Sequence, residues 1–382
     1  MRILHVLYES KGDSFGIGGV GVRAYELYKY LKDRHDITLL CKKYPGEGLS
    51  PIEGLRHLYV GTESKNLTRT LLSYAYHVAL FVKKHGNDFD IIVEEFSPAI
   101  PTFSHALTKK PIILQIQGYT GGLYFRKYNP FYALALYAME RMRTVFYGNF
   151  IFLNAETAGH FMLRKKKKVG IIPNGISPEL LNTLPEEGDF ILYLGRIDIY
   201  GKGLDLLIRA YGDFHRSFPD VRLAIAGDGR DMEKLKLMLR QRPEEVSRNI
   251  KLLGWASGDR KADLLRRALF VIFPSRHEVQ PISALEAMAC EKALIVSDIT
   301  AFSFVTKQGA GLSFRNGSSS SLVQAMKELM KSNDRSRMGG KGRNLVRQYT
   351  WDKIAFKYEG FLTEVHQLHH DTKKTVTSIE QE

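Results

Sequence analysis

The strongest constraint on this chain is a repeated alternation of short apolar runs with helical patterns. Arg2 to Tyr8 is an apolar run typical of a strand, and the stretch after it places apolar residues at the spacing of one buried helix face. Such alternation is typical of βα units, which build parallel sheets covered by helices. It predicts an α/β fold.

The alternation occurs in two series with a polar segment between them. Residues 178–188 are polar, acidic and contain proline, as a linker should be, and 382 residues are too many for one core. We therefore predict Rossmann-like domains at 1–180 and 188–350, and a disordered tail at 371–382. The apolar runs predicted as strands are 2–8, 37–41, 91–93, 111–116 and 150–153 in the first series, and 190–194, 222–226, 251–253, 270–273 and 293–296 in the second.

Charge indicates an anionic partner. The chain has 55 Lys and Arg against 41 Asp and Glu, a formal net charge of +14. Nucleic acid, an anionic membrane surface or a phosphorylated small molecule would each satisfy this excess. Nucleic acid is disfavoured, because no helix-turn-helix, zinc-finger or RNP-type motif is present and the cations are spread over both halves.

Targeting and redox features favour a cytoplasmic protein. The chain opens directly on a strand pattern rather than a signal peptide, and no apolar run reaches the ~18 residues of a spanning helix. Membrane contact would then be peripheral, at the cytoplasmic face. Cys41 and Cys290 are the only cysteines, which excludes a disulfide scaffold and a multi-cysteine zinc site.

The first candidate motif is Gly16-x-Gly18-x-x-Gly21. It matches the dinucleotide fingerprint, but seven residues separate it from the strand, and the next strand ends in Cys41-Lys42-Lys43 rather than an acid. A dehydrogenase is therefore disfavoured. Glycines at a helix N-terminus still let backbone amides approach an anion, and a loop without ligand is the alternative.

The second and third motifs follow strands of the second series. Arg196 and Lys202 lie on a glycine-rich turn after Phe190 to Leu194, where both could reach one diphosphate. Glu278 lies on the loop after Phe270 to Phe273, and Glu286 lies just inside the next helix, whose free amides point at that loop. Because ligands bind doubly wound sheets at the carboxyl ends of their strands, we expect a site in a cleft between the two domains.

Together these motifs resemble the large retaining glycosyltransferase family with the two-Rossmann GT-B fold, often called family 4. The resemblance covers nearly the whole chain. Its pieces, in family order, are Gly18-Gly19, Ile171-Ile172-Pro173-Asn174-Gly175-Ile176, Gly195-Arg196 with Lys202-Gly203, Ala226-Gly227-Asp228-Gly229, Leu253-Gly254-Trp255, Glu278-x7-Glu286-Ala287-Met288-Ala289 and Trp351-Asp352-Lys353-Ile354-Ala355.

The resemblance implies transfer of a hexose-type sugar from a UDP- or GDP-sugar to a hydroxyl of a saccharide or lipid-linked acceptor. Anomeric configuration would be retained, with no metal or other cofactor. An epimerase or phosphorylase of the same fold is the alternative. The final helix, at about 352–370, would cross back onto the first domain.

The resemblance also assigns roles to residues. Arg196 and Lys202 would neutralise the departing diphosphate, and Glu278 would hold sugar hydroxyls. The remaining donor contacts would be Glu286 on the ribose, the amides of Ile282 and Ser283 on phosphate, Trp255 and Ala256 along the base, Gly18 and Gly19 from the first domain, and Asn174, Gly195 and Gly229 within their motifs.

Three positions depart from the family pattern. Many relatives have Glu-Gly-Phe-Gly where this chain has Glu278-Val279-Gln280-Pro281. The proline removes one backbone amide, and the sequence does not determine which sugar the donor carries. Gln117 stands where many carry a histidine; it can contact the sugar or acceptor but holds no positive charge. Glu291 replaces the usual glycine, and the sequence offers no reason.

Three other features have plain structural interpretations. Asp88-Phe89-Asp90 resembles the metal motif of GT-A transferases, but it directly precedes a strand, so a turn is favoured and no metal site is predicted. The basic run 164–168 is a solvated loop or a contact to anionic lipid. The aromatic and basic stretch 124–147 is helix core with a solvated face, or an acceptor or membrane-surface site.

Overall fold

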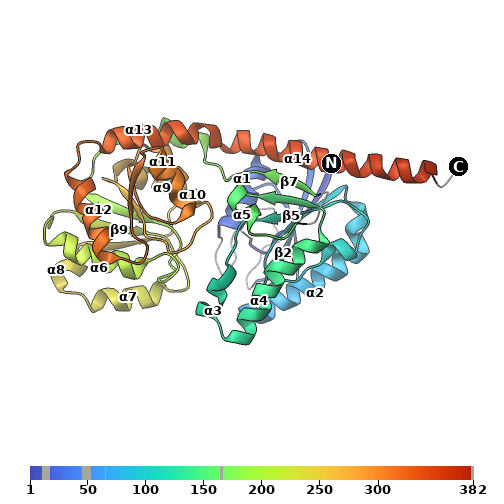
Figure 1. Ribbon diagram of the computed structural model, residues 1–382, viewed down its shortest axis with the longest axis horizontal. Helices are drawn as coiled ribbons and strands as arrows, with labels where there is room; N and C mark the ends of the chain where they lie inside the picture. Colours follow the sequence, from blue (N-terminus) through green and yellow to red (C-terminus); the bar gives the residue numbers. More distant parts are fainter. Residues whose placement is uncertain (11–17, 45–52, 65, 164–166, 380–382) are drawn as a thin grey trace. The chain divides into compact units, whose positions relative to one another are not determined.

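The computed structural model describes residues 1–10, 18–44, 53–64, 66–163 and 167–379. The chain folds into two compact units (Figure 1). Unit 1 comprises 1–174 and 351–382, and unit 2 comprises 175–350. Both are parallel α/β units, as predicted. No helix in the described part is both long and apolar enough to cross a membrane.

Unit 1 contains one parallel sheet with the strand order β3-β2-β1-β4-β5-β6-β7. The chain builds outward from β1 on one side and then from β4 on the other, so the topological switch lies between these two strands. The strands are β1 (Arg2–Val6), β2 (Asp36–Lys42), β3 (Arg56–Val60), β4 (Ile91–Glu95), β5 (Ile112–Ile116), β6 (Asn149–Phe152) and β7 (Lys168–Ile171). The helices are α1 (Gly19–Lys29), α2 (Leu67–His85), α3 (Tyr124–Lys127), α4 (Pro130–Met142), α5 (Ala155–Gly159) and α14 (Trp351–Ile379), with 3₁₀ turns at Gly86–Asp88, Ser104–Ala106, Gly121–Leu123 and Arg143–Phe146.

Unit 2 contains a second parallel sheet, ordered β10-β9-β8-β11-β12-β13, with its switch between β8 and β11. The strands are β8 (Phe190–Leu194), β9 (Arg222–Ala226), β10 (Ile250–Gly254), β11 (Val271–Phe273), β12 (Leu294–Ser297) and β13 (Gly311–Phe314). The helices are α6 (Leu204–His215), α7 (Met232–Arg240), α8 (Glu244–Ser247), α9 (Gly258–Arg267), α10 (Ile282–Ala289), α11 (Ser303–Lys307), α12 (Ser319–Lys331) and α13 (Arg335–Val346), with 3₁₀ turns at Pro178–Asn182, Thr300–Phe302 and Arg347–Tyr349.

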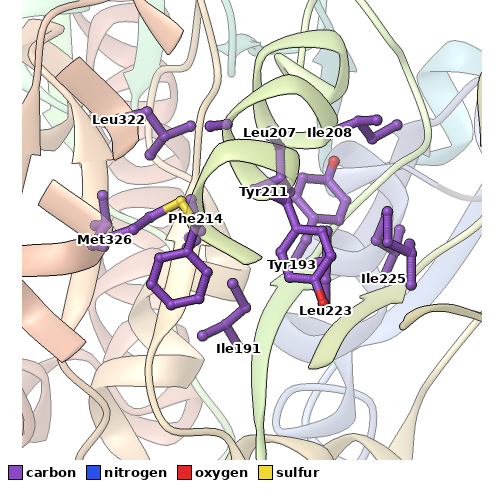
Figure 2. Packing of buried hydrophobic residues seen from close by; sticks show 14 of the residues in the cluster. Ile191, Tyr193, Leu207, Ile208, Tyr211, Phe214, Leu223, Ile225, Leu322 and Met326 are labelled. Atoms are coloured by element: carbon purple, nitrogen blue, oxygen red, sulfur yellow. The ribbon is translucent and has the colours of Figure 1, made fainter. Parts of the chain in front are cut away.

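The main core of unit 2 lies between its sheet and helix α6. Leu207, Tyr211 and Phe214 recur at the spacing of one helix face and are fully buried. Figure 2 shows them packed with strand residues Ile191, Tyr193, Leu223 and Ile225 and with Leu322 and Met326 of α12. This packing fixes the start of α6, which immediately follows the loop with Arg196 and Lys202.

Helix α14 is part of unit 1. Its Glu359 pairs with His35 at 2.7 Å and Arg34 at 3.0 Å, and Tyr358 stacks edge-on against Tyr28 of α1. Gly170 of β7 allows this approach, since a Cβ there would lie 2.9 Å from the Phe361 ring.

Two segments differ from the prediction. Residues 178–188 are not a free linker, because Leu180 is buried in the unit 2 core and the amides of Glu186 and Gly188 donate to carbonyls of α9. Residues 371–379 are not disordered but continue α14; no Gly or Pro follows Gly360 to end the helix. Residues 380–382 lie outside the described residues.

Candidate functional site

The candidate residues of unit 2 gather at the carboxyl edge of its sheet. Arg196 and Lys202 follow β8, Gly229 follows β9, and Trp255 follows β10. The loop with Glu278 follows β11, which pairs directly with β8. Neighbouring parallel strands end at the same edge, so the two loops meet at the switch point, where doubly wound sheets bind ligands.

The loops after β8 and β11 are tied together. The amide of Arg276 donates to the Gly201 carbonyl at 3.0 Å, and its guanidinium donates to both carboxylate oxygens of Asp205 at 2.7 Å. Gly203 has φ +67°, and a Cβ there would lie 1.9 Å from the Pro274 carbonyl oxygen. Only glycine fits this position. The loops therefore form one preorganised surface.

Lys202 and Glu278 form an ion pair across this surface. The Lys202 ammonium contacts Glu278 Oε1, and Ser275 Oγ donates to the same oxygen at 2.9 Å. Both side chains are mostly buried, at 20% and 11% exposure. The roles that the resemblance implies for these residues, one on diphosphate and one on sugar, therefore belong to groups in direct contact.

Arg196 is exposed, and its guanidinium has no partner among the described residues. Its backbone is fixed instead, because the buried Tyr193 hydroxyl donates to the Arg196 carbonyl at 2.7 Å. Burial raises the pKa of Tyr193 well above its usual value, so this donor keeps its proton. The backbone of Arg196 is therefore fixed, while its guanidinium is free to contact a ligand.

The glycines of this region permit close backbone approach. A Cβ at Gly229 would lie 2.4 Å from the Ile197 carbonyl oxygen, and one at Gly227 would lie 1.8 Å from that of Gly195. The amide of Ile197 donates to the Asp228 carbonyl at 2.8 Å. Gly195 and Gly229 thus hold the loops after β8 and β9 together.

The N-terminus of α10 lies beside Glu286 and a lysine that the sequence did not single out. The amides of Ile282 and Ser283 have no acceptor among the described residues. Glu286 is 6% exposed and pairs with Lys261 of α9. Lys261 lies in a highly charged helix, so no sequence signal distinguished it.

The two residues predicted to line the base differ in exposure. Trp255 is 49% exposed, which leaves an aromatic face available, whereas Ala256 is 6% exposed and packs in the unit 2 core. The ring of Trp255 is thus the group at this position that a planar base would stack on.

In unit 1, Gly18 and Gly19 begin helix α1, but a carboxylate already occupies the helix end. Glu9 Oε2 accepts from the amides of Gly18 at 2.9 Å and Gly21 at 2.7 Å. A Cβ at Gly18 would lie 2.6 Å from Glu9, while Gly19 has open space. The Glu9 carboxylate thus already accepts hydrogen bonds at the helix end that was predicted to approach a diphosphate. Gly16 is outside the described residues.

Asn174 is held within unit 1. It is 3% exposed, and its Oδ1 accepts from Arg23 Nη1 at 3.0 Å. The fully buried Arg23 guanidinium also donates to the carbonyls of Pro173 at 2.7 Å and Ile172 at 2.9 Å. Burial lowers the pKa of Arg23 to about 10. The motif that contains Asn174 is thus fixed by a buried cation.

Gln117 belongs to a buried polar network at the carboxyl ends of β1, β4 and β5. Its Nε2 donates to both oxygens of Glu95, at 3.0 and 3.1 Å. Glu95 also contacts Gln115, and it contacts His5 at 3.1 Å, which in turn contacts Tyr28 at 2.7 Å. With its amino group fixed on Glu95, Gln117 has its carbonyl oxygen left to accept a hydrogen bond.

Several secondary features have structural roles. Asp90 accepts hydrogen bonds from the amide of Arg2 at 2.8 Å and from the Arg2 guanidinium at 3.1 Å, as a turn entering β4 requires.

Among the described residues no group of three or more His, Cys, Asp or Glu could hold a metal ion. Glu291 has φ +55°, the left-handed region that favours glycine, and it pairs with Arg343 at 3.1 Å.

The basic run 164–168 lies only in part within the described residues. Lys168 begins β7 and pairs with Glu364 of α14. Lys167 donates to the Thr144 carbonyl at 2.8 Å. These two cations thus make internal contacts.

Comparison with known proteins identifies the family. Residues 182–345 match the family model "Glycosyl transferases group 1", and residues 17–180 match "Glycosyltransferase Family 4". This chain belongs to the group 1 glycosyltransferases of the GT-B fold. The chain is 31% identical over 193 residues to a phosphatidyl-myo-inositol mannosyltransferase of Mycobacterium leprae, covering 48% of this chain and 50% of that protein. It spans about half the length of the curated relatives it matches.

Solved structures show the same fold as this glycosyltransferase. Sucrose-phosphate synthase from Thermosynechococcus elongatus matches with a TM-score of 0.78 at 16% identity, covering 96% of this chain and 99% of that one. Anabaena HepE in complex with UDP and glucose matches with a TM-score of 0.70 at 17% identity, and the match covers 95% of this chain and 100% of HepE.

Proposed function

We propose that this glycosyltransferase moves a hexose-type sugar from a UDP- or GDP-sugar to a hydroxyl of a saccharide or lipid-linked acceptor. The proposal rests on the surface formed by the loops after β8 and β11, where Lys202 contacts Glu278, with Arg196 on the first loop and the free amides of α10 after the second. A diphosphate needs the cations and amides, and a sugar needs the carboxylate. The complex of HepE with UDP and glucose and the similarity to a mannosyltransferase support the same substrate class.

Two carboxylates of the site pair with lysines that the bound donor would contact instead. Lys202 pairs with Glu278, and Lys261 pairs with Glu286. A bound diphosphate would draw Lys202 away and free Glu278 to accept from sugar hydroxyls. Lys261 and Glu286 would separate in the same way, with Glu286 turning to the ribose. Donor binding is then an exchange of charged partners rather than the burial of new unpaired charge.

The proposed transfer retains the anomeric configuration without a protein nucleophile. The bond between the anomeric carbon and the phosphate oxygen breaks as the acceptor oxygen attacks from the same face. The acceptor proton passes to the departing phosphate, which leaves as a nucleoside diphosphate. Arg196 and Lys202 stabilise the charge that develops on that leaving group, the work that a metal ion performs in other transferases.

A donor screen with product analysis tests this function. The full chain is incubated with UDP-, GDP- and ADP-sugars and with extracted lipid or oligosaccharide acceptors. We expect one nucleoside diphosphate to be released together with an acceptor lengthened by one sugar in the donor's anomeric configuration. An epimerised donor, a sugar phosphate product or an inverted linkage would contradict the proposal.

A further inference from the structure

Helix α4 of unit 1 is apolar on its solvent face as well as its buried face. The inner face contributes Ala133 and Leu136 to a small core with Tyr124. The outer face presents Phe131, which is 87% exposed, and Met142, which is 62% exposed. A surface helix ordinarily places polar residues on that side.

The exposed apolar surface continues onto helix α3. Its members, which we call the α3–α4 surface, are Phe125, Tyr128, Phe131, Tyr132, Leu134 and Met142, each at least 43% exposed. Arg126 and Lys127 lie among them and are exposed. Several exposed apolar side chains on two successive helices, next to cations, are typical of an interaction surface.

The two helices that carry this surface are firmly anchored. The buried Glu140 carboxylate accepts from the amides of Thr120 at 2.8 Å and Gly121 at 2.7 Å, and from the Tyr124 hydroxyl at 3.0 Å. Just after α4, the buried Arg143 pairs with the buried Glu94 of β4. The apolar face is therefore presented by a fixed scaffold.

Charge restricts what this surface can bind. Between Glu95 and Glu156 the only acidic residue is Glu140, against six Lys and Arg. Because Glu140 is 1% exposed and fully used inside the unit, the stretch offers only cations to the outside. Its partner must be apolar in part and negatively charged.

We propose that the α3–α4 surface docks onto a bilayer containing anionic phospholipid. Phe131, Leu134 and Met142 enter the boundary between headgroups and acyl chains, tyrosines lie at headgroup depth, and Arg126 and Lys127 contact phosphates. The assignment rests on this surface alone. It is independent of the proposed sugar transfer, so either can fail without the other.

Vesicle co-sedimentation of the full chain tests this assignment. We expect binding to vesicles of phosphatidylcholine mixed with phosphatidylglycerol and much weaker binding to phosphatidylcholine alone. Arg126→Gln with Lys127→Gln should weaken binding about 25-fold, since each cation near the surface contributes about fivefold. Phe131→Ser with Leu134→Ser and Met142→Ser should weaken it at least as much, with the thermal midpoint unchanged.

The matched control is Phe356→Ser on α14, which removes a 73% exposed aromatic of the same unit from outside the surface and should leave binding intact. Equal binding by the triple variant and the wild type would overturn the proposal. So would a dimer in light scattering that the triple variant dissociates, because the surface would then be an interface between copies of this chain.

Discussion

At the residue scale, Gln117 shows how a single substitution from the family pattern is accommodated. A histidine there could carry a positive charge, whereas Gln117 fixes its amino group on Glu95 and presents a carbonyl oxygen. The contact that we propose for it is therefore acceptance from a hydroxyl of the sugar or acceptor.

Gln117→Glu tests the network. It places a second carboxylate within hydrogen-bond distance of Glu95, and two adjacent carboxylates cannot both ionise without cost. We expect the free energy of unfolding to fall by about 1–3 kcal/mol at pH 8 and to recover partly as the pH falls and one carboxyl gains a proton. Chemical denaturation at pH 8 and pH 5 measures this. Gln117→Met, which adds no charge, should show little pH dependence; an equal dependence in both variants would contradict the placement.

At the element scale, Arg23 connects helix α1 to the segment that follows β7. Its guanidinium supplies donors to Ile172, Pro173 and Asn174, all of them buried or nearly so. The position of Asn174 therefore depends on an arginine of α1 that is 151 residues away in the sequence.

Arg23→Met is expected to lower the free energy of unfolding of the full chain by about 3 kcal/mol or more, because three acceptors lose their donor. Urea denaturation measures the change. Arg69→Met on α2, which removes an exposed arginine of the same unit, should cost less than about 0.5 kcal/mol. A similar small loss for both variants would show that Arg23 does not hold this segment.

The sequence predicted the buried strands and the edge strand β10, but it missed the other three strands at the sheet edges. Arg56–Val60, Lys168–Ile171 and Gly311–Phe314 each lie at one end of a sheet and are half-exposed, so they lack a continuous apolar run. In the candidate site, residues placed directly after strands were predictable. Lys261 and Glu95 were not predictable. Each contacts a candidate residue, Glu286 and Gln117 respectively, only because the tertiary fold brings the two together.

At the scale of the whole molecule, buried lysines and buried cysteines have opposite effects on the stability of the folded chain as the pH rises. Burial lowers the pKa of Lys42 and of Lys292 to about 8, so the unfolded chain binds more protons between about pH 8 and 10.4 and stability rises there. Burial raises the pKa of Cys290 to about 11 and that of Cys41 to about 12, so above about pH 8.5 the unfolded chain loses protons first and stability falls.

Lys292→Met separates these effects, since the cysteines are common to both proteins. The charged Lys292 is a cost to the folded state at pH 7 that disappears as it deprotonates. We expect the stability of the variant relative to wild type to fall by about 2 kcal/mol or more between pH 7 and pH 10.5. Denaturation curves at both pH values measure this, and a pH-independent difference would mean that Lys292 has an ordinary pKa.

The proposed function requires that the loops after β8 and β11 bind the diphosphate of a nucleotide donor. Calorimetric titration of the full chain with UDP, GDP and ADP tests it most directly. We predict that one nucleotide binds and that Arg196→Ala and Lys202→Ala each weaken it by about tenfold or more, since each removes a charge-assisted hydrogen bond. Lys234→Ala, which removes an exposed cation of α7 (74% exposed), should have no effect. Failure of all three nucleotides to bind, or unchanged affinity in both loop variants, would contradict the claim.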